Sequence, residues 1–100
     1  MRDLTEMNKL EAYLKEHGYD YTREDKDSIS DEVRGMDVHQ IVVYKNDKRQ
    51  WDVICHYGSF GAKSGLLEMM DETKRLVLNE DRVEGWLTAD EIIRRLEGRP

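Results

Sequence analysis

The stretch VHQIVVYKNDKRQWDVICHY, residues 38–57, decides the fold. Its two ends, 38–44 and 51–57, are rich in β-branched and aromatic side chains, which are typical of strands, and an Asn-Asp pair lies between them. A connection this short joins adjacent strands only when they run antiparallel, because a parallel crossover needs about a dozen residues or more. We therefore predict a central antiparallel hairpin over 38–44 and 51–57.

The register of this hairpin decides which polar side chains meet. If Tyr44 pairs with Trp51, then His39 lies opposite His56, and a register shifted by one residue places His39 opposite Cys55 instead. Either pair begins a zinc site, but two ligands are too few, and no C-x-x-C or H-x-x-x-H spacing adds to them. His39 and His56 are thus weak metal candidates beside the alternative of a polar cross-strand pair, and we expect no cofactor.

Three helices flank the hairpin in the sequence pattern. Apolar residues at helical spacing, among them Met7, Leu10 and Leu14, predict a helix over about 5–17 that ends at Gly18. Leu66, Leu67 and Met70 predict a second helix over 65–72, capped by Ser64. Thr88 and Glu91 have the spacing of a capping box, which predicts a third helix over 89–97.

The remaining segments complete an α+β domain. Residues 19–22 read as a short strand, the charged run 23–32 as a loop, and 75–78 with 83–87 as a second, weaker hairpin. Strands joined by short turns and separated by helices predict a small antiparallel sheet packed with three helices. We expect a single α+β domain over 1–100.

The composition narrows the classes of function. The chain has 22 acidic and 16 basic residues and a net charge of −6, whereas nucleic-acid binders carry a basic excess, so we expect no direct binding of DNA or RNA. The single cysteine, Cys55, fits a reducing compartment. The first residues lack the apolar core of a signal peptide, and no run is long enough to span a membrane, so we expect a cytoplasmic protein.

The segment GSFGAKSG, residues 58–65, raises the question of phosphate binding. A P-loop has the spacing G-x-x-x-x-G-K-[ST], but only two residues separate Gly58 from Gly61 here, and Ala62 stands before Lys63. We predict that these glycines shape a turn between a strand and a helix. The alternative is a site for a small ligand or an anion, with His56, Ser59, Lys63 and Ser64 as its candidate residues.

The side chains around this turn suggest contact with a protein rather than catalysis. Tyr57, Phe60 and Trp86 either form a semi-exposed protein-contact patch or close the core of a small domain, and the sequence leaves both open. Cys55 is expected to be buried with no cation beside it, because it shares a strand face with Trp51 and Val53. Its neighbour His56 points to the opposite face of a strand, so the two form no nucleophile–base pair.

Two longer stretches carry a resemblance to known sequences. WDVICHYGSFGAKSGLLEMM (51–70) and VEGWLTADEIIRRLEG (83–98) resemble a family of small uncharacterised proteins from phages, prophages and other mobile elements of gut Firmicutes. The similarity extends over most of the chain after Met7. It implies a small accessory protein made inside a bacterial cell, and it implies no activity, cofactor or catalytic residue.

The sequence therefore favours a non-enzymatic module that binds a protein partner. This expectation rests on the small size, the acidic charge, the aromatic side chains beside a glycine-rich turn, and the lack of a complete catalytic constellation. Binding of a small ligand or an anion by the 58–64 turn is the alternative function. The identity of the partner and the formation of a homo-oligomer are left open.

Overall fold

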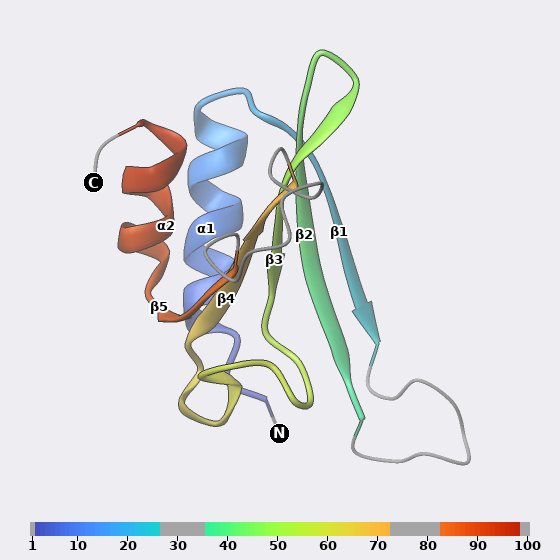
Figure 1. The fold of residues 1–100 in the computed structure, drawn as a ribbon, viewed down its shortest axis with the longest axis vertical. Helices are drawn as coiled ribbons and strands as arrows, with labels where there is room; N and C mark the ends of the chain where they lie inside the picture. Colours follow the sequence, from blue (N-terminus) through green and yellow to red (C-terminus); the bar gives the residue numbers. More distant parts are fainter. Residues whose placement is uncertain (1, 27–35, 73–82, 99–100) are drawn as a thin grey trace.

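The computed structural model describes residues 2–26, 36–72 and 83–98, which form a five-stranded antiparallel sheet packed with two α-helices. In chain order the elements are α1 (Thr5–Glu16), β1 (Asp20–Lys26), β2 (Val38–Lys45), β3 (Lys48–Ile54), the 3₁₀ turn η1 (Ala62–Ser64), β4 (Leu67–Asp71), β5 (Val83–Leu87) and α2 (Ala89–Leu96). The strands lie in the sheet in their order along the chain, β1 to β5 (Figure 1). The predicted α+β class with an antiparallel sheet is confirmed.

The predicted central hairpin is formed by β2 and β3, with a tighter turn than expected and with a second strand that begins and ends three residues earlier, at Lys48 and Ile54. Asn46 and Asp47 have φ angles of 54° and 64°, and two consecutive residues with positive φ are the mark of the two-residue turn that suits a twisted hairpin. Gln40 lies opposite Ile54, and the N–H of Cys55 donates to the carbonyl of His39 at 3.0 Å. The shifted register is therefore the one present, and His39 does not face His56.

Both helices pack on one face of the sheet, where the core lies (Figure 1). The strands contribute alternate residues to this core, such as Ile41 and Val43 from β2, because successive side chains of a strand point to opposite faces. The core cluster consists of Met7, Leu10, Leu14, Ile41, Val43, Val53, Cys55, Ala62, Leu67, Met69, Leu87, Ala89 and Ile92. The helices predicted over 5–17 and 89–97 are thus present as α1 and α2.

The prediction of a third helix over 65–72 is wrong, because this segment forms strand β4. Leu67 and Met69 are buried while the residue between them is only half-buried, which is the period of a strand. The apolar run fits both a helix and a strand, and pairing decides between them. As a strand, β4 satisfies the free edge of β3, where Met69 lies opposite Val53.

The helical turn that does form lies earlier and is much shorter. Gly61 and Gly65, with φ angles of 92° and 72°, bracket the three residues of η1, so a left-handed residue stops the helix at each end. Ser64 is the last residue of this 3₁₀ turn. The prediction that Ser64 caps a following helix is therefore wrong.

Two further predictions are changed or lie outside the described residues. The strand expected over 19–22 runs from Asp20 to Lys26, so the start of the predicted loop 23–32 belongs to β1. Strand 83–87 is present as β5, but its described partner is β4. Its predicted hairpin partner, 75–78, lies outside the described residues.

Helix α2 begins as its sequence predicts. The Thr88 hydroxyl accepts from the N–H of Glu91 at 3.3 Å, and the Glu91 carboxylate accepts from the N–H of Thr88 at 3.1 Å, which is a complete capping box. In the part of the chain that the structure describes, neither helix has the length and apolar character needed to cross a membrane.

Candidate functional site

The glycine loop, residues 58–65, leaves β3 and folds against the edge strand β5. The N–H of Trp86 donates to the carbonyl of Phe60 at 3.3 Å, which joins the loop to that strand. A Cβ on Gly61 would lie 2.9 Å from the Cβ of Leu66 and 3.0 Å from the Cα of Trp86. A Cβ on Gly85 would overlap the Cβ of Phe60. Glycine at both positions is therefore required for this close approach.

Strand β5 carries a bulge where the loop contacts it. Leu67 pairs with Leu87 and Met69 pairs with Glu84, so two residues of β5, 85 and 86, lie opposite the single residue 68 of β4. Trp86 at this bulge has φ of 62°, a left-handed conformation that bulky residues adopt rarely and at a cost in free energy. A bulge redirects a side chain, and here the Trp86 side chain is exposed.

Three large apolar side chains are exposed together at this place. Tyr57, Phe60 and Trp86 are 57%, 59% and 62% exposed, and all three line a pocket of about 400 Å³. We call these three residues the aromatic platform. The sequence left open whether these side chains form a semi-exposed contact patch or close the core. Their exposure opposes the second alternative. The pocket is lined also by Arg2, Ser59 and Lys63.

The loop does not present the donors that a phosphate cradle needs. A P-loop binds phosphates through backbone N–H groups that point into the hollow of the loop, and in this chain many of those groups already donate to oxygen atoms of the protein. Eight backbone N–H groups in and beside the loop donate to oxygen atoms of the chain, namely those of His56, Tyr57, Ser59, Phe60, Ala62, Ser64, Gly65 and Leu66. Lys63 and Ser64 are exposed at the end of η1.

His56 is not part of the platform pocket, although it was predicted as a candidate ligand residue beside Ser59. Its backbone closes the turn, since its N–H donates to the Ser59 hydroxyl at 3.0 Å and its carbonyl accepts from that hydroxyl at 2.8 Å. Its Nδ1 is buried and has no hydrogen-bond partner among the described residues. Ser59 and Lys63 therefore line the platform pocket together with the aromatic side chains, and His56 does not line it.

A chain of hydrogen-bonded ionisable side chains runs from the exposed Asp25 through the buried His39 and Asp37 to Arg2, and sequence reasoning missed it. His39 is 5% exposed and lies between two carboxylates, with Nδ1 2.7 Å from Asp25 and Nε2 3.0 Å from Asp37. Asp37 also accepts two bonds from Arg2, at 2.7 and 2.8 Å, and one from the N–H of Tyr57 at 3.2 Å. No local motif signals this arrangement, because its members are brought together by strand pairing and by the N-terminus.

This chain of charges holds two residues of the platform pocket in place. The hydrogen bonds from Arg2 lower the pKa of Asp37 from 3.8 to about 2, so Asp37 is a carboxylate at neutral pH. As a carboxylate it fixes the Arg2 side chain and the Tyr57 backbone at once.

The part of the chain that the structure describes contains no group of three or more histidine, cysteine and acidic side chains arranged to hold a metal ion.

Cys55 is fully buried, as its strand position predicts. Burial raises the pKa of its thiol, which keeps it in the unreactive protonated form. The expectation that no cation lies beside it is wrong, because Arg2 is near enough to lower this pKa, but the effect of burial is larger. We assign Cys55 to the core.

Comparisons with known proteins add no relative. No protein-family model matches the sequence, and neither a curated protein nor a solved structure matches it. The resemblance to proteins of phages and mobile elements therefore stays a prediction.

Proposed function

We propose that this protein is a non-enzymatic interaction module that binds a protein partner through the aromatic platform of Tyr57, Phe60 and Trp86. The observation that carries the proposal is the left-handed, exposed Trp86. Holding a bulky residue at φ of 62° costs about 1–3 kcal/mol, and a side chain that is 62% exposed regains little of this by burial. Strain of this kind concentrates at functional sites, and tryptophan is among the residues that dominate binding energy at protein interfaces.

The surroundings of the platform suggest the chemistry of the partner. Arg2 is already paired with Asp37, whereas Lys63 is exposed and takes part in no ion pair among the described residues. A partner that inserts an apolar or aromatic side chain between the three rings and places a carboxylate near Lys63 complements both features. The net charge of −6 opposes nucleic acid as the ligand. The sequence resemblance alone is the basis for proposing that this module is an accessory protein of a phage or mobile element and acts in the bacterial cytoplasm.

A capture experiment with matched variants tests this proposal. Wild type, Trp86→Gly, Phe60→Ser and Tyr44→Ala are immobilised and exposed to lysate of a gut Firmicute, and the bound proteins are quantified by mass spectrometry. We expect a partner that is retained by wild type and by Tyr44→Ala, whose change lies on the hairpin and not on the platform, and lost with both platform variants. Retention of the same proteins by all four would contradict the proposal. Self-association that both platform variants abolish would identify the partner as a second copy of the chain.

The platform pocket supports a second candidate function, the binding of a small ligand or an anion at the 58–64 turn. Its volume of about 400 Å³ suits a small molecule, and Ser59 and Lys63 supply a hydroxyl and a cation. Nucleotide binding is disfavoured because most N–H groups of the loop already donate to oxygen atoms of the protein. We expect no thermal shift with millimolar ATP or GTP and magnesium, whereas saturation at a hundred times the dissociation constant adds about 2.7 kcal/mol. A shift that Lys63→Ala abolishes would favour this second function.

A further inference from the structure

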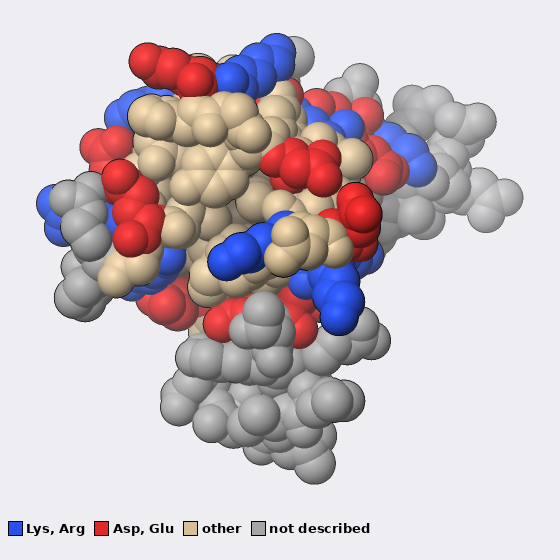
Figure 2. All heavy atoms as spheres, turned by 90° about the horizontal axis from the view of Figure 1, so that it is seen from above, with Lys and Arg blue, Asp and Glu red and all other residues tan. Residues whose placement is uncertain are grey.

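A second pocket lies at the other end of the molecule, where the β2–β3 hairpin extends past the ends of the two helices (Figure 1). Its volume is about 580 Å³. Figure 2 shows this end as a broad area of uncharged side chains with acidic and basic groups around it. This pocket, which we call the hairpin pocket, is separate from the aromatic platform, since the two share no lining residue among those described.

The hairpin pocket results from the way the hairpin and the helices end. The pairing of β2 with β3 shifts after Val43, where Gln50 is an extra residue on β3, and such a bulge bends and twists the hairpin. Helix α1 ends at Glu16, two residues before Gly18 with its φ of 70°, and α2 ends at Leu96. The helices therefore cover the sheet only up to this level, and a hollow remains beneath the hairpin.

The hairpin pocket is lined by aromatic and aliphatic side chains together with polar ones. The rings of Tyr13 and Tyr19 are 5.8 Å apart, centroid to centroid, and the ring of Tyr13 lies 4.2 Å from that of His17. Trp51 and Leu96 are half-buried and pack against the core. These rings are tilted to one another by 35° and 39°, and they give the hairpin pocket aromatic walls against which a planar aromatic group can pack.

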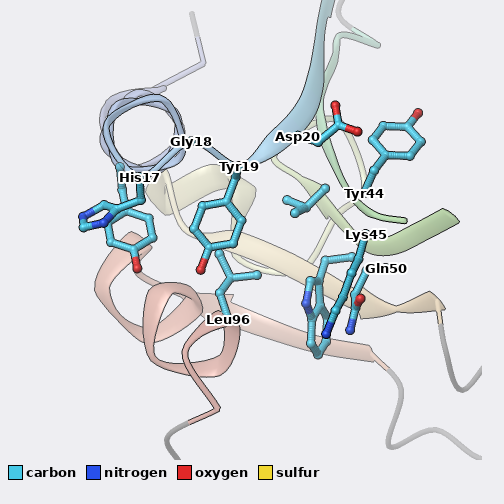
Figure 3. A pocket seen from close by; sticks show the side chains of 11 residues that line it. His17, Gly18, Tyr19, Asp20, Tyr44, Lys45, Gln50 and Leu96 are labelled. Atoms are coloured by element: carbon cyan, nitrogen blue, oxygen red, sulfur yellow. The ribbon is translucent and has the colours of Figure 1, made fainter. Parts of the chain in front are cut away.

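The lining of the hairpin pocket includes one ammonium group, that of Lys45, and one carboxylate, that of Asp20. Figure 3 shows His17 and Tyr19 on one side and Lys45 and Gln50 on the other. The side chain of Asp20 projects away from the space between them in the same view. Lys45 is exposed and forms no ion pair with the residues that the structure describes. The rim therefore offers a free ammonium group and a neutral amide to a ligand that carries negative charge.

We propose that the hairpin pocket binds a small planar aromatic carboxylate. The aromatic ring lies against Tyr19 and Trp51, and the carboxylate extends to the rim, where Lys45 supplies the charge and Gln50 the hydrogen bond. The inference does not depend on the protein-binding function of the platform, because the two surfaces are separate.

The experiment is a titration with 2-naphthoate, followed by ¹⁵N–¹H NMR. The two tryptophans report on the two pockets, since Trp51 lines the hairpin pocket and Trp86 lines the platform pocket. We expect a saturable shift of the indole N–H of Trp51 at millimolar concentration and none of Trp86. No saturable shift, or a shift of Trp86 alone, would overturn the proposal.

The charge of the ligand is tested with Lys45→Gln and with the neutral amide 2-naphthamide. Because an exposed ion pair contributes up to about 1 kcal/mol, Lys45→Gln should weaken naphthoate binding up to about fivefold and leave naphthamide binding unchanged. Lys48→Gln, an exposed lysine of the same hairpin outside the pocket lining, is the control and should change neither. Equal affinities of wild type and Lys45→Gln for naphthoate would contradict the role of Lys45 and the preference for a carboxylate.

Discussion

The backbone N–H of Trp86 donates to the carbonyl oxygen of Phe60 at 3.3 Å, and this bond ties strand β5 to the glycine loop. Two residues of the aromatic platform are thus linked through their main chains. The third, Tyr57, is held through its own N–H by Asp37. The exposed rings are therefore mounted on a backbone that is fixed at each position, which lowers the conformational entropy that a partner must remove on binding.

The strain at Trp86 is measurable by comparing two truncations. Trp86→Ala and Trp86→Gly both remove the indole, but only glycine adopts φ of 62° without steric cost. We expect the glycine variant to have the larger free energy of unfolding, by about 1 kcal/mol, in urea titrations. An alanine variant as stable as the glycine variant would show that the left-handed conformation is not strained.

The close contact of Gly61 with β5 is tested against another glycine of the same loop. Gly58 and Gly61 both have positive φ, at 82° and 92°, but a Cβ on Gly58 meets nothing within 4 Å, whereas one on Gly61 meets Leu66 and Trp86. Gly61→Ala should therefore lower the free energy of unfolding by about 1–3 kcal/mol more than Gly58→Ala does. Equal losses would mean that the loop moves away from β5 without cost.

The pairing of Asp37 with Arg2 predicts a pH dependence of stability. The pKa of Asp37 falls from 3.8 to about 2 on folding, so its contribution is fully present above pH 3.8 and is lost as the pH falls through about 2. The contribution is at most about 2 kcal/mol, because some solvent reaches the side chain. Chemical denaturation of wild type and Asp37→Asn at pH 5 and pH 2 measures it. We expect the difference between them to shrink at pH 2, and a constant difference would contradict the assignment.

The capping box of α2 gives a separate test of the fold. Thr88→Ala removes the hydroxyl that accepts from the N–H of Glu91, and it should lower the free energy of unfolding by about 1 kcal/mol. Thr88→Ser keeps the hydroxyl and serves as the control, with a loss well below that of alanine. Equal melting temperatures of wild type and Thr88→Ala would count against the cap.

Local sequence signals predicted the parts of the fold that local interactions determine. The hairpin over 38–57 was readable because β-branched runs flank an Asn-Asp pair, and α2 because Thr88 and Glu91 have the capping-box spacing. The strand within 65–72 could not be predicted in this way, because the apolar residues of this segment fit a helix and a strand equally. The open edge of β3 decides in favour of the strand, and an open edge is a property of the assembled sheet.

The candidate site was predictable to the same extent. The platform residues were identifiable as large aromatic side chains beside a glycine-rich turn, and the structure shows them exposed and close together. The left-handed conformation of Trp86 could not be predicted from the sequence, since a bulge depends on the register between β4 and β5. The chain from Asp25 through His39 to Asp37 and Arg2 was also hidden, because these residues meet only in the folded protein.

The most direct test of the central claim is the affinity of Trp86→Gly for the captured partner, measured by calorimetry together with the free energy of unfolding of the same variant. A residue that dominates an interface contributes about 2 kcal/mol or more, so we predict a dissociation constant raised at least about thirtyfold. We predict also that the variant retains its fold, because glycine relieves the strain at this position. An unchanged dissociation constant in a folded Trp86→Gly variant would contradict the account.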